Sequence, residues 1–215
     1  AKEAQAGLII AVGGGSAVGT ARAITIALGE GKTVYELCAT YPPDGPPVSP
    51  RLTQPKLPIF AVLTTPTTAV DRGGVAVMDD KPPHRLELFD PKVRPTAIFL
   101  DSDALLTAPF PLFRDTSATT FCQTISALQS PRLNPFNQAD LRQVLEQLLT
   151  YLPRLVQEPD DGEVRIQLAV TAILANRAAD APSSRGQRVS NNLDHQLLFQ
   201  YDHVRQGASL SALVR

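Results

Sequence analysis

The chain has 215 residues, of which 43% are hydrophobic and 19% charged, and its formal net charge at pH 7 is −1. This length supports one large hydrophobic core or two smaller ones, so the composition predicts a globular protein. Its 20 basic and 21 acidic residues form no long run of one sign, which argues against nucleic acid or a membrane surface as a partner. No apolar run reaches the roughly 20 residues that span a bilayer, and the N-terminus lacks the features of a signal peptide.

Only two cysteines are present, Cys38 and Cys122, and they are far apart in the sequence. They lack the spacing of a metal site, and so few cysteines are typical of a reducing compartment. The sequence therefore predicts a cytoplasmic protein.

The first motif is an apolar run that stops at a glycine-rich loop. Residues 8–12 read LIIAV, residues 13–16 read GGGS, and an alanine-rich segment follows at once. This order predicts a strand, a tight loop and the start of a helix. Backbone N–H groups at such a helix start, together with the helix dipole, favour phosphate. The alternative stays open that the glycines only supply a tight turn, because the run is neither G-x-G-x-x-G nor a P-loop.

A proline-rich segment and a second buried strand come next. Residues 41–58 contain seven prolines and predict an extended surface loop. Residues 59–64 predict a buried strand that ends in a threonine-rich loop, residues 64–68. If this strand lies beside the first, the threonine hydroxyls can reach the same ligand as the glycine loop. Alternatively, they cap local backbone groups.

The rest of the first half continues in strands. Residues 73–80 and 84–90 alternate like a hairpin that closes near residues 81–83, and residues 95–101 form another apolar run that ends at Asp101. Strands interleaved with one clear helix predict an α/β domain over residues 1–105.

From about Ala104 the pattern becomes helical. A helix is expected over residues 115–130, with Asp115 or Thr116 as its cap. Further helices are expected over residues 137–156, 160–180 and 191–215, so residues 106–215 predict a helical domain. A cleft between the two domains is the default place for a site. The apolar stripe of the segment 137–156 consists of Leu141, Val144, Leu145, Leu148, Leu149 and Leu152.

Four stretches in this order carry a resemblance to a known family. They read IIAVGGGSAVGTARAI, TTPTTA, DPKVRPTAIFLD and TSATTFCQTISALQSPRLNP. The sequence resembles the iron-containing alcohol dehydrogenase-like family, whose fold is shared with dehydroquinate synthase. The resemblance implies an α/β domain that binds NAD or NADP, followed by an all-α domain. It also implies hydride transfer between the nicotinamide and a small alcohol, aldehyde or oxo acid.

The resemblance assigns roles to residues. The pyrophosphate would lie against the glycine loop, and two threonines would line the nucleotide site. His195 corresponds to a family histidine near the nicotinamide and would relay a proton to or from the substrate oxygen. Alternatively, His195 only pairs with Asp194 or Asp202 on a helix surface. The cofactor-binding residues implied are Gly13, Gly14, Gly15, Ser16, Thr67 and Thr68.

The sequence departs from the family at the metal site. The family binds iron or zinc through one aspartate and three histidines, whereas the matching positions here hold Cys122, Ser126, Asn191 and Arg205. Ser and Asn are poor ligands for such a cation, and an arginine repels it, so no metal is expected. In place of the metal, the positive charge of Arg205 can polarise a carbonyl. Alternatively, Arg205 simply faces solvent.

The chain resembles the middle part of the family fold. Strands expected before Gly7 and helices expected after Arg215 are absent, and the loop after Ala69 is shorter than in the family. Gly19 stands where the family's alcohol dehydrogenases usually have Asp, which is similar to its maleylacetate reductase branch. The alternatives are therefore a maleylacetate-reductase-like enzyme and a non-catalytic nucleotide-binding or regulatory homologue. A homodimer is left open.

Overall fold

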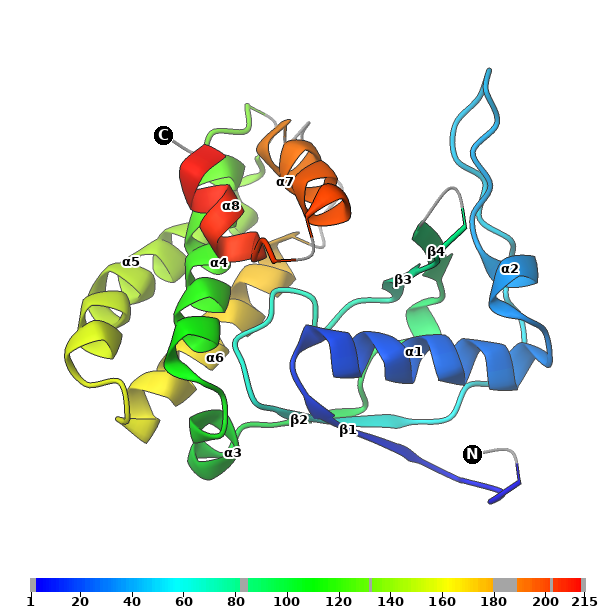
Figure 1. Cartoon of the computed structure of the whole chain (residues 1–215), viewed down its shortest axis with the longest axis horizontal. Helices are drawn as coiled ribbons and strands as arrows, with labels where there is room; N and C mark the ends of the chain where they lie inside the picture. Colours follow the sequence, from blue (N-terminus) through cyan, green and yellow to red (C-terminus); the bar gives the residue numbers. More distant parts are fainter. Residues whose placement is uncertain (1–2, 82–84, 132, 180–188, 202, 214–215) are drawn as a thin grey trace. The chain divides into compact units, whose positions relative to one another are not determined.

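The computed structural model describes residues 3–81, 85–131, 133–179, 189–201 and 203–213 (Figure 1). Contacts divide the chain into two compact units, of which the first comprises Ala1–Val62 and Val70–Phe99. The second comprises Leu63–Ala69 and Leu100–Arg215. The first unit contains strands and the second is mostly helical, so the expected order of an α/β part and a helical part is confirmed. The domain boundary after residue 105 stays a prediction.

A three-stranded sheet organises the first unit. It consists of β1 (Ile9–Gly13), β2 (Ile59–Leu63) and β5 (Ala97–Phe99), in the order β1-β2-β5. Strands β2 and β5 are parallel, and Phe60 lies opposite Ala97. The helix α1 (Gly15–Glu30) follows β1 and packs against it (Figure 1). The sequence thus predicted this strand–loop–helix correctly, and β2 to within one residue.

A hairpin of β3 (Gly74–Met78) and β4 (Arg85–Phe89) forms a second sheet. The strands pair antiparallel with Gly74 opposite Phe89, which confirms the expected hairpin. The turn was expected near residues 81–83, of which 82 and 83 lie outside the described residues. A short 3-10 helix, η1 (Pro91–Val93), follows β4 and leads to β5.

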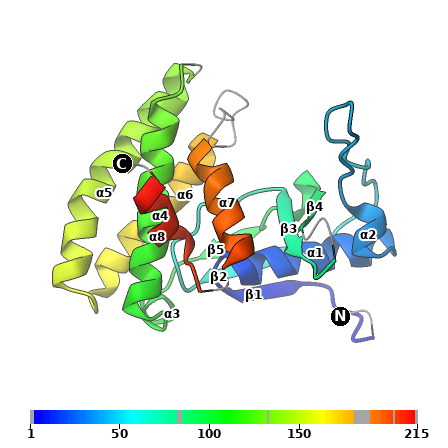
Figure 2. The same cartoon turned by 45° about the horizontal axis from the view of Figure 1, so that its top comes forward.

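The proline-rich segment leaves from a helix that the sequence analysis did not anticipate. This helix, α2 (Val34–Leu37), is short and has a capping box between Thr33 and Glu36. Residues 41–49 are all exposed, and the backbone groups of Thr40 and Val48 close a bridge at their base. In Figures 1 and 2 this part projects beyond α2 as a narrow loop, as expected for an exposed segment.

A buried lysine holds the far end of the same segment. The side chain of Lys56 has no exposed surface, and its Nζ lies 2.7 Å from a carboxylate oxygen of Glu30 and 3.2 Å from one of Asp90. Glu30 ends α1 and Asp90 precedes η1, so one ammonium group ties three segments together. Ion pairs of Lys56 therefore help to hold the loop where it returns to the sheet.

Six helices build the second unit in the part of the chain that the structure describes. The long helices α4, α5 and α6 pack against one another, and α8 lies along α4 in both views (Figures 1 and 2). The helices are α3 (Ser102–Leu106), α4 (Phe110–Leu128), α5 (Pro135–Gln157), α6 (Gly162–Ala179), α7 (Val189–Gln200) and α8 (Gln206–Leu213).

Two expectations for the helices were wrong. The helix α4 begins at Phe110, so Asp115 and Thr116 lie inside it and cap nothing. The reason is Pro111, which is well suited to the first turn of a helix, whereas the Asp115 carboxylate binds arginine side chains. In α5, Leu149 is 61% exposed although it was expected on the apolar stripe. Leu141, Val144 and Leu148 of that stripe are buried as expected.

Within the described residues, no helix is long and apolar enough to cross a membrane.

Candidate functional site

The glycine loop gives α1 an open N-terminus. Gly13 ends β1 with a φ of +145°, a conformation that side chains rarely adopt. Gly14 occupies the N-cap position, where no side chain bonds the free N–H groups of the first turn. That turn holds no acidic residue, and Gly15 and Ser16 are exposed. The backbone donors and the positive end of the helix dipole are therefore available to an anion.

The threonine-rich loop follows β2, the neighbour of β1 in the sheet. Thr65 and Pro66 are buried, whereas Thr67 and Thr68 are partly exposed. The Thr67 hydroxyl accepts a weak bond from the backbone N–H of Ala69 at 3.4 Å. The sequence analysis expected the threonine loop near the glycine loop only if their strands were neighbours, and β1 and β2 are neighbours. The role of Thr67 and Thr68 towards a nucleotide stays a prediction.

A buried arginine in α1 positions the segment between the threonine loop and β3. Arg22 is 2% exposed, and its guanidinium donates to the backbone carbonyls of Val70 and of Gly74, the latter at 3.3 Å. Burial, and then the positive charge of Arg72, lowers the pKa of Arg22 to about 10. The shortened loop after Ala69 is thus held against α1 by a buried cation.

The helical unit contains a buried polar cluster that the sequence analysis did not identify. Cys122 of α4 is 5% exposed and Asp194 of α7 is fully buried. Burial, and then the charge of Asp194, raises the pKa of the Cys122 thiol, so the thiol stays protonated at neutral pH. An Asp194 carboxylate oxygen accepts a bond of 3.1 Å from the amide of Gln206, the first residue of α8. The bond between Asp194 and Gln206 joins α7 to α8.

Arg205, expected from the sequence as a candidate, lies directly before α8. Its Nη1 is 3.1 Å from a carboxylate oxygen of Asp115, which also binds Arg114 at 2.8 Å. Asp115 is 7% exposed, whereas just over half of the Arg205 side chain is exposed. The sequence analysis offered two roles for Arg205, to polarise a substrate or to face solvent. The structure adds a bond to the buried carboxylate of Asp115.

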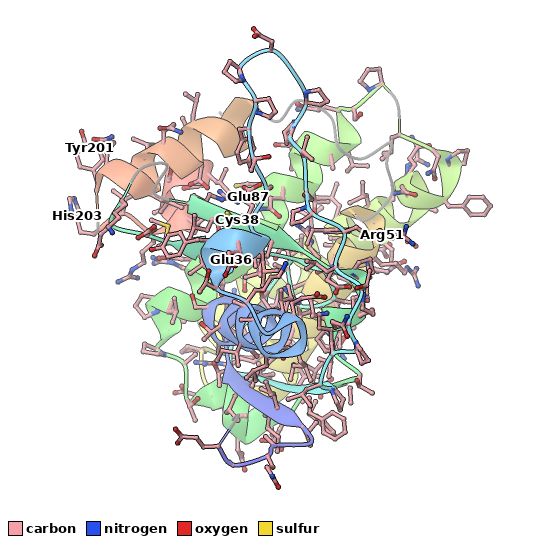
Figure 3. The ribbon with its side chains drawn as sticks, turned by 90° about the vertical axis from the view of Figure 1, so that its right-hand side faces the viewer. Glu36, Cys38, Arg51, Glu87, Tyr201 and His203 are labelled. Atoms are coloured by element: carbon pink, nitrogen blue, oxygen red, sulfur yellow. The ribbon has the colours of Figure 1, made fainter. Side chains whose placement is uncertain are left out.

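The histidines are only partly described. The backbone of His195 lies in α7, but its side chain is outside the described residues, as are His84 and the side chain of Asn191. His203 lies between α7 and α8, so it does not share a helix with His195. The exposed rings of His203 and Tyr201 lie next to each other, 6.1 Å between centroids (Figure 3).

The observed roles of Asp115, Asp194 and Gln206 escaped the sequence analysis because each of them bonds to a residue outside its local sequence. Asp115 and Arg205 are 90 positions apart, and no local pattern links them. Asp115 had been interpreted as a cap, which is the commonest role of an aspartate near a helix start. The sequence held one signal for its other role: Arg114 directly precedes Asp115, so the two charged side chains can pair inside the helix.

Comparisons with known proteins agree with this architecture. The family model for iron-containing alcohol dehydrogenases matches residues 1–102. An NAD-dependent methanol dehydrogenase of Bacillus methanolicus is 23% identical over 197 residues, which cover 91% of this chain and 49% of that protein. A probable mitochondrial hydroxyacid-oxoacid transhydrogenase of Dictyostelium discoideum is 28% identical over 204 residues, which cover 78% of this chain and 35% of that protein.

Solved structures share the fold. An alcohol dehydrogenase from Oenococcus oeni superposes with a TM-score of 0.84 at 23% identity, covering 99% of this chain and 52% of that one. A 1,3-propanediol oxidoreductase gives a TM-score of 0.85 at 22% identity, covering 99% of this chain and 53% of that one. The chain thus spans about half the length of the structures, and half or less of the curated relatives.

Proposed function

Because the resemblance to the iron-containing alcohol dehydrogenase family and to its dehydroquinate synthase-like fold is confirmed, we propose that the protein is an NAD(P)-dependent oxidoreductase. It transfers a hydride to or from a small alcohol, aldehyde or oxo acid. One observation carries the proposal: α1 presents an uncapped N-terminus after a glycine loop, with no acidic residue in its first turn. Such a terminus suits the pyrophosphate of a dinucleotide.

The cofactor proposal names Gly13, Gly14, Gly15 and Ser16 as the pyrophosphate cradle, with Thr67 and Thr68 at the nucleotide. The geometry of α1 supports the first four, and the resemblance alone supports the two threonines. NAD is favoured over NADP, because the names of relatives such as the methanol dehydrogenase specify NAD. The chemistry of hydride transfer belongs to the nicotinamide, and the protein supplies orientation and charge.

The residues at the family's metal positions do not fit a metal ion. Cys122, at the position of the family's aspartate, is a buried thiol rather than a carboxylate. The guanidinium of Arg205 is a cation bound to Asp115, and Ser126 offers a weakly coordinating hydroxyl. We therefore propose catalysis without iron or zinc and derive no step through a metal.

Two side chains carry the proposed chemistry. His195 relays a proton to or from the substrate oxygen, which is the role of the matching histidine in the resemblance. Arg205 stabilises negative charge that develops on that oxygen, and Asp115 positions its guanidinium. A maleylacetate-reductase-like enzyme is the alternative within the same class of NAD(P)-dependent oxidoreductases.

A second candidate is a non-catalytic homologue that binds a nucleotide or regulates a partner. The specific observation that favours it is the replacement of the whole metal-ligand set, including the buried and protonated Cys122. Fold alone does not separate the two candidates. We further propose a cytoplasmic location, because both cysteines are free, and no binding to nucleic acid or membrane, because the basic residues form no long run.

A fluorescence titration with NADH and NADPH tests the proposal. Saturable enhancement of the nicotinamide emission is expected for the wild type and is expected to be lost in Gly15→Asp, because a carboxylate at the helix start repels phosphate. The matched control is Gly7→Asp, which adds the same charge at an exposed glycine with no atom within 4 Å of its added Cβ. Equal binding by Gly15→Asp would contradict the cradle, and no binding by the wild type would favour a regulatory homologue that has lost the nucleotide.

A further inference from the structure

Two arginines share one buried carboxylate in the helical unit. Arg114 donates from Nε and Nη2 to one oxygen of Asp115, at 3.1 Å and 2.8 Å. Arg205 donates from Nη1 to the other oxygen at 3.1 Å. The carboxylate is 9% exposed, whereas the side chains of Arg114 and Arg205 are 50% and 54% exposed. The inner side of each guanidinium is thus occupied and its other side meets solvent.

The backbone around Arg205 is held by several contacts. Its carbonyl oxygen accepts the N–H of Ser209 at 3.0 Å, in the first turn of α8. Gly207 packs so tightly on the backbone of Asp115 that a Cβ there has no room. Gln206 is bound to the buried Asp194. These contacts hold the backbone on both sides of Arg205, and Asp115 holds its side chain. Binding a ligand therefore costs less side-chain entropy than it would at a free arginine.

The charge of this cluster suits an anion. Two guanidinium groups against one carboxylate leave a net positive charge on a half-exposed surface. Each guanidinium has five N–H donors in a planar fork, and the bonds to Asp115 use two of Arg114 and one of Arg205. The remaining donors match the two oxygens of a carboxylate, with which arginine forms its strongest and most specific pairs.

We propose that Arg114 and Arg205 bind the carboxylate of the substrate, which makes the substrate an oxo acid or the corresponding hydroxy acid rather than a simple alcohol. Asp115 is the positioning residue that holds both guanidinium groups. This inference rests on the proposed oxidoreductase function. In a 2-oxo acid the carboxylate adjoins the reducible carbonyl, so the same Arg205 can serve both groups. The name of the Dictyostelium relative, a hydroxyacid-oxoacid transhydrogenase, agrees with this class.

Calorimetric titration with malonate tests the site without any reaction, because malonate has carboxylates and no reducible carbonyl. We expect saturable binding to the wild type, and none for the neutral analogue malonamide. Arg114→Gln is expected to weaken malonate binding at least about tenfold, since charge-assisted hydrogen bonds are lost. Arg154→Gln is the matched control, because it removes an equally exposed arginine of the same unit at the α5–α6 junction.

Inorganic phosphate, titrated in the same way, separates the two sources of an oxyanion. Weaker binding of phosphate than of malonate supports the carboxylate. Preference for phosphate would overturn the assigned substrate class. Equal binding of malonate by the wild type and by Arg114→Gln, or no binding by the wild type, would show that the arginines only tie α8 to α4 and would overturn the site itself.

A parallel NADH titration separates this inference from the proposed function. Loss of malonate binding with normal NADH binding in Arg114→Gln supports the site. Arginine-dependent malonate binding by a protein that does not bind NADH would refute the oxidoreductase proposal and with it the substrate role. In turnover assays, Arg114→Gln is expected to raise KM for 2-oxo acids about tenfold and to leave KM for an aldehyde of equal length unchanged.

Discussion

Gly13 and Ala17 lie so close that a Cβ built on Gly13 would be 2.8 Å from the Cβ of Ala17. This contact couples the last residue of β1 to the first turn of α1, and the φ of +145° at Gly13 makes the chain reverse within the loop. The proposed cradle therefore depends on a position that only glycine occupies without strain.

Gly13→Ala is expected to lower the free energy of unfolding by roughly 2–4 kcal/mol, from backbone strain and the contact with Ala17 together. Urea denaturation followed by circular dichroism measures this change. Gly7→Ala is the control, because an added Cβ at Gly7 meets no atom within 4 Å. Equal stability of the two variants would mean that the loop tolerates a side chain, and the cradle geometry would be wrong.

Lys56→Met is expected to lower Tm at pH 7, since Glu30 and Asp90 lose the ammonium group that lies between them. Hydrogen bonds from Lys56 hold the pKa of Glu30 below its usual value. For Asp90, burial raises the pKa, but hydrogen bonds from Lys92 and Lys56 outweigh it and the net change is a decrease.

The pH dependence follows from these directions. A carboxyl whose pKa is lower in the folded state binds fewer protons there than in the unfolded chain. It therefore stabilises the fold when the pH is above the usual pKa of about 4. That stability is lost as the pH falls below this value. Thermal melts from pH 7 to pH 3 should therefore show a gap between wild type and Lys56→Met that narrows on acidification. A gap independent of pH would assign the effect to packing instead.

Arg165→Met is expected to destabilise the helical unit by about 3 kcal/mol. Arg165 is 2% exposed and donates to the carbonyls of Leu105 and Ala108, each at 2.8 Å, and its guanidinium lies 4.8 Å from the ring centroid of Phe113. Methionine fills a similar volume but leaves buried carbonyls unpaired. Denaturant midpoints of Arg165→Met and of the exposed control Arg154→Gln measure the difference. A stable Arg165→Met would show that water replaces the guanidinium.

Gly207→Ala is expected to push α8 away from α4, because an added Cβ meets the backbone of Asp115. The cost is about 1–3 kcal/mol, as for other overpacked contacts. Protection of α8 amides from hydrogen exchange should fall, while that of α5 amides stays unchanged. Unaltered protection in α8 would mean that the two helices are not closely docked.

The elements predicted correctly from the sequence are those with local signals. The strand–glycine–helix start, the hairpin of β3 and β4 and the strand β2 all follow from period, apolar runs and turn residues within a few positions. The failures also have local causes. Asp115 resembles a helix cap but lies inside α4. Leu149 fits the apolar stripe but is exposed, because the local pattern does not show which side of α5 the other helices cover.

The resemblance pointed to Arg205 and Cys122 through single positions, and it left their chemistry open. The structure adds Asp115 as the bonded partner of Arg205, which makes Arg205 part of a charged cluster. It also shows that the Cys122 thiol is buried, and this burial raises the pKa of the thiol.

The sequence by itself determined the order of the elements and the glycine loop at the start of α1. These properties depend on residue type and on spacing along the chain. Only the tertiary structure decided which partner each charge meets: Lys56 lies between Glu30 and Asp90, Arg22 against the backbone carbonyl of Val70, and Arg205 against Asp115. Such pairs form wherever packing buries a charge, because burial is costly unless a partner lies within hydrogen-bond distance, whatever the separation in sequence.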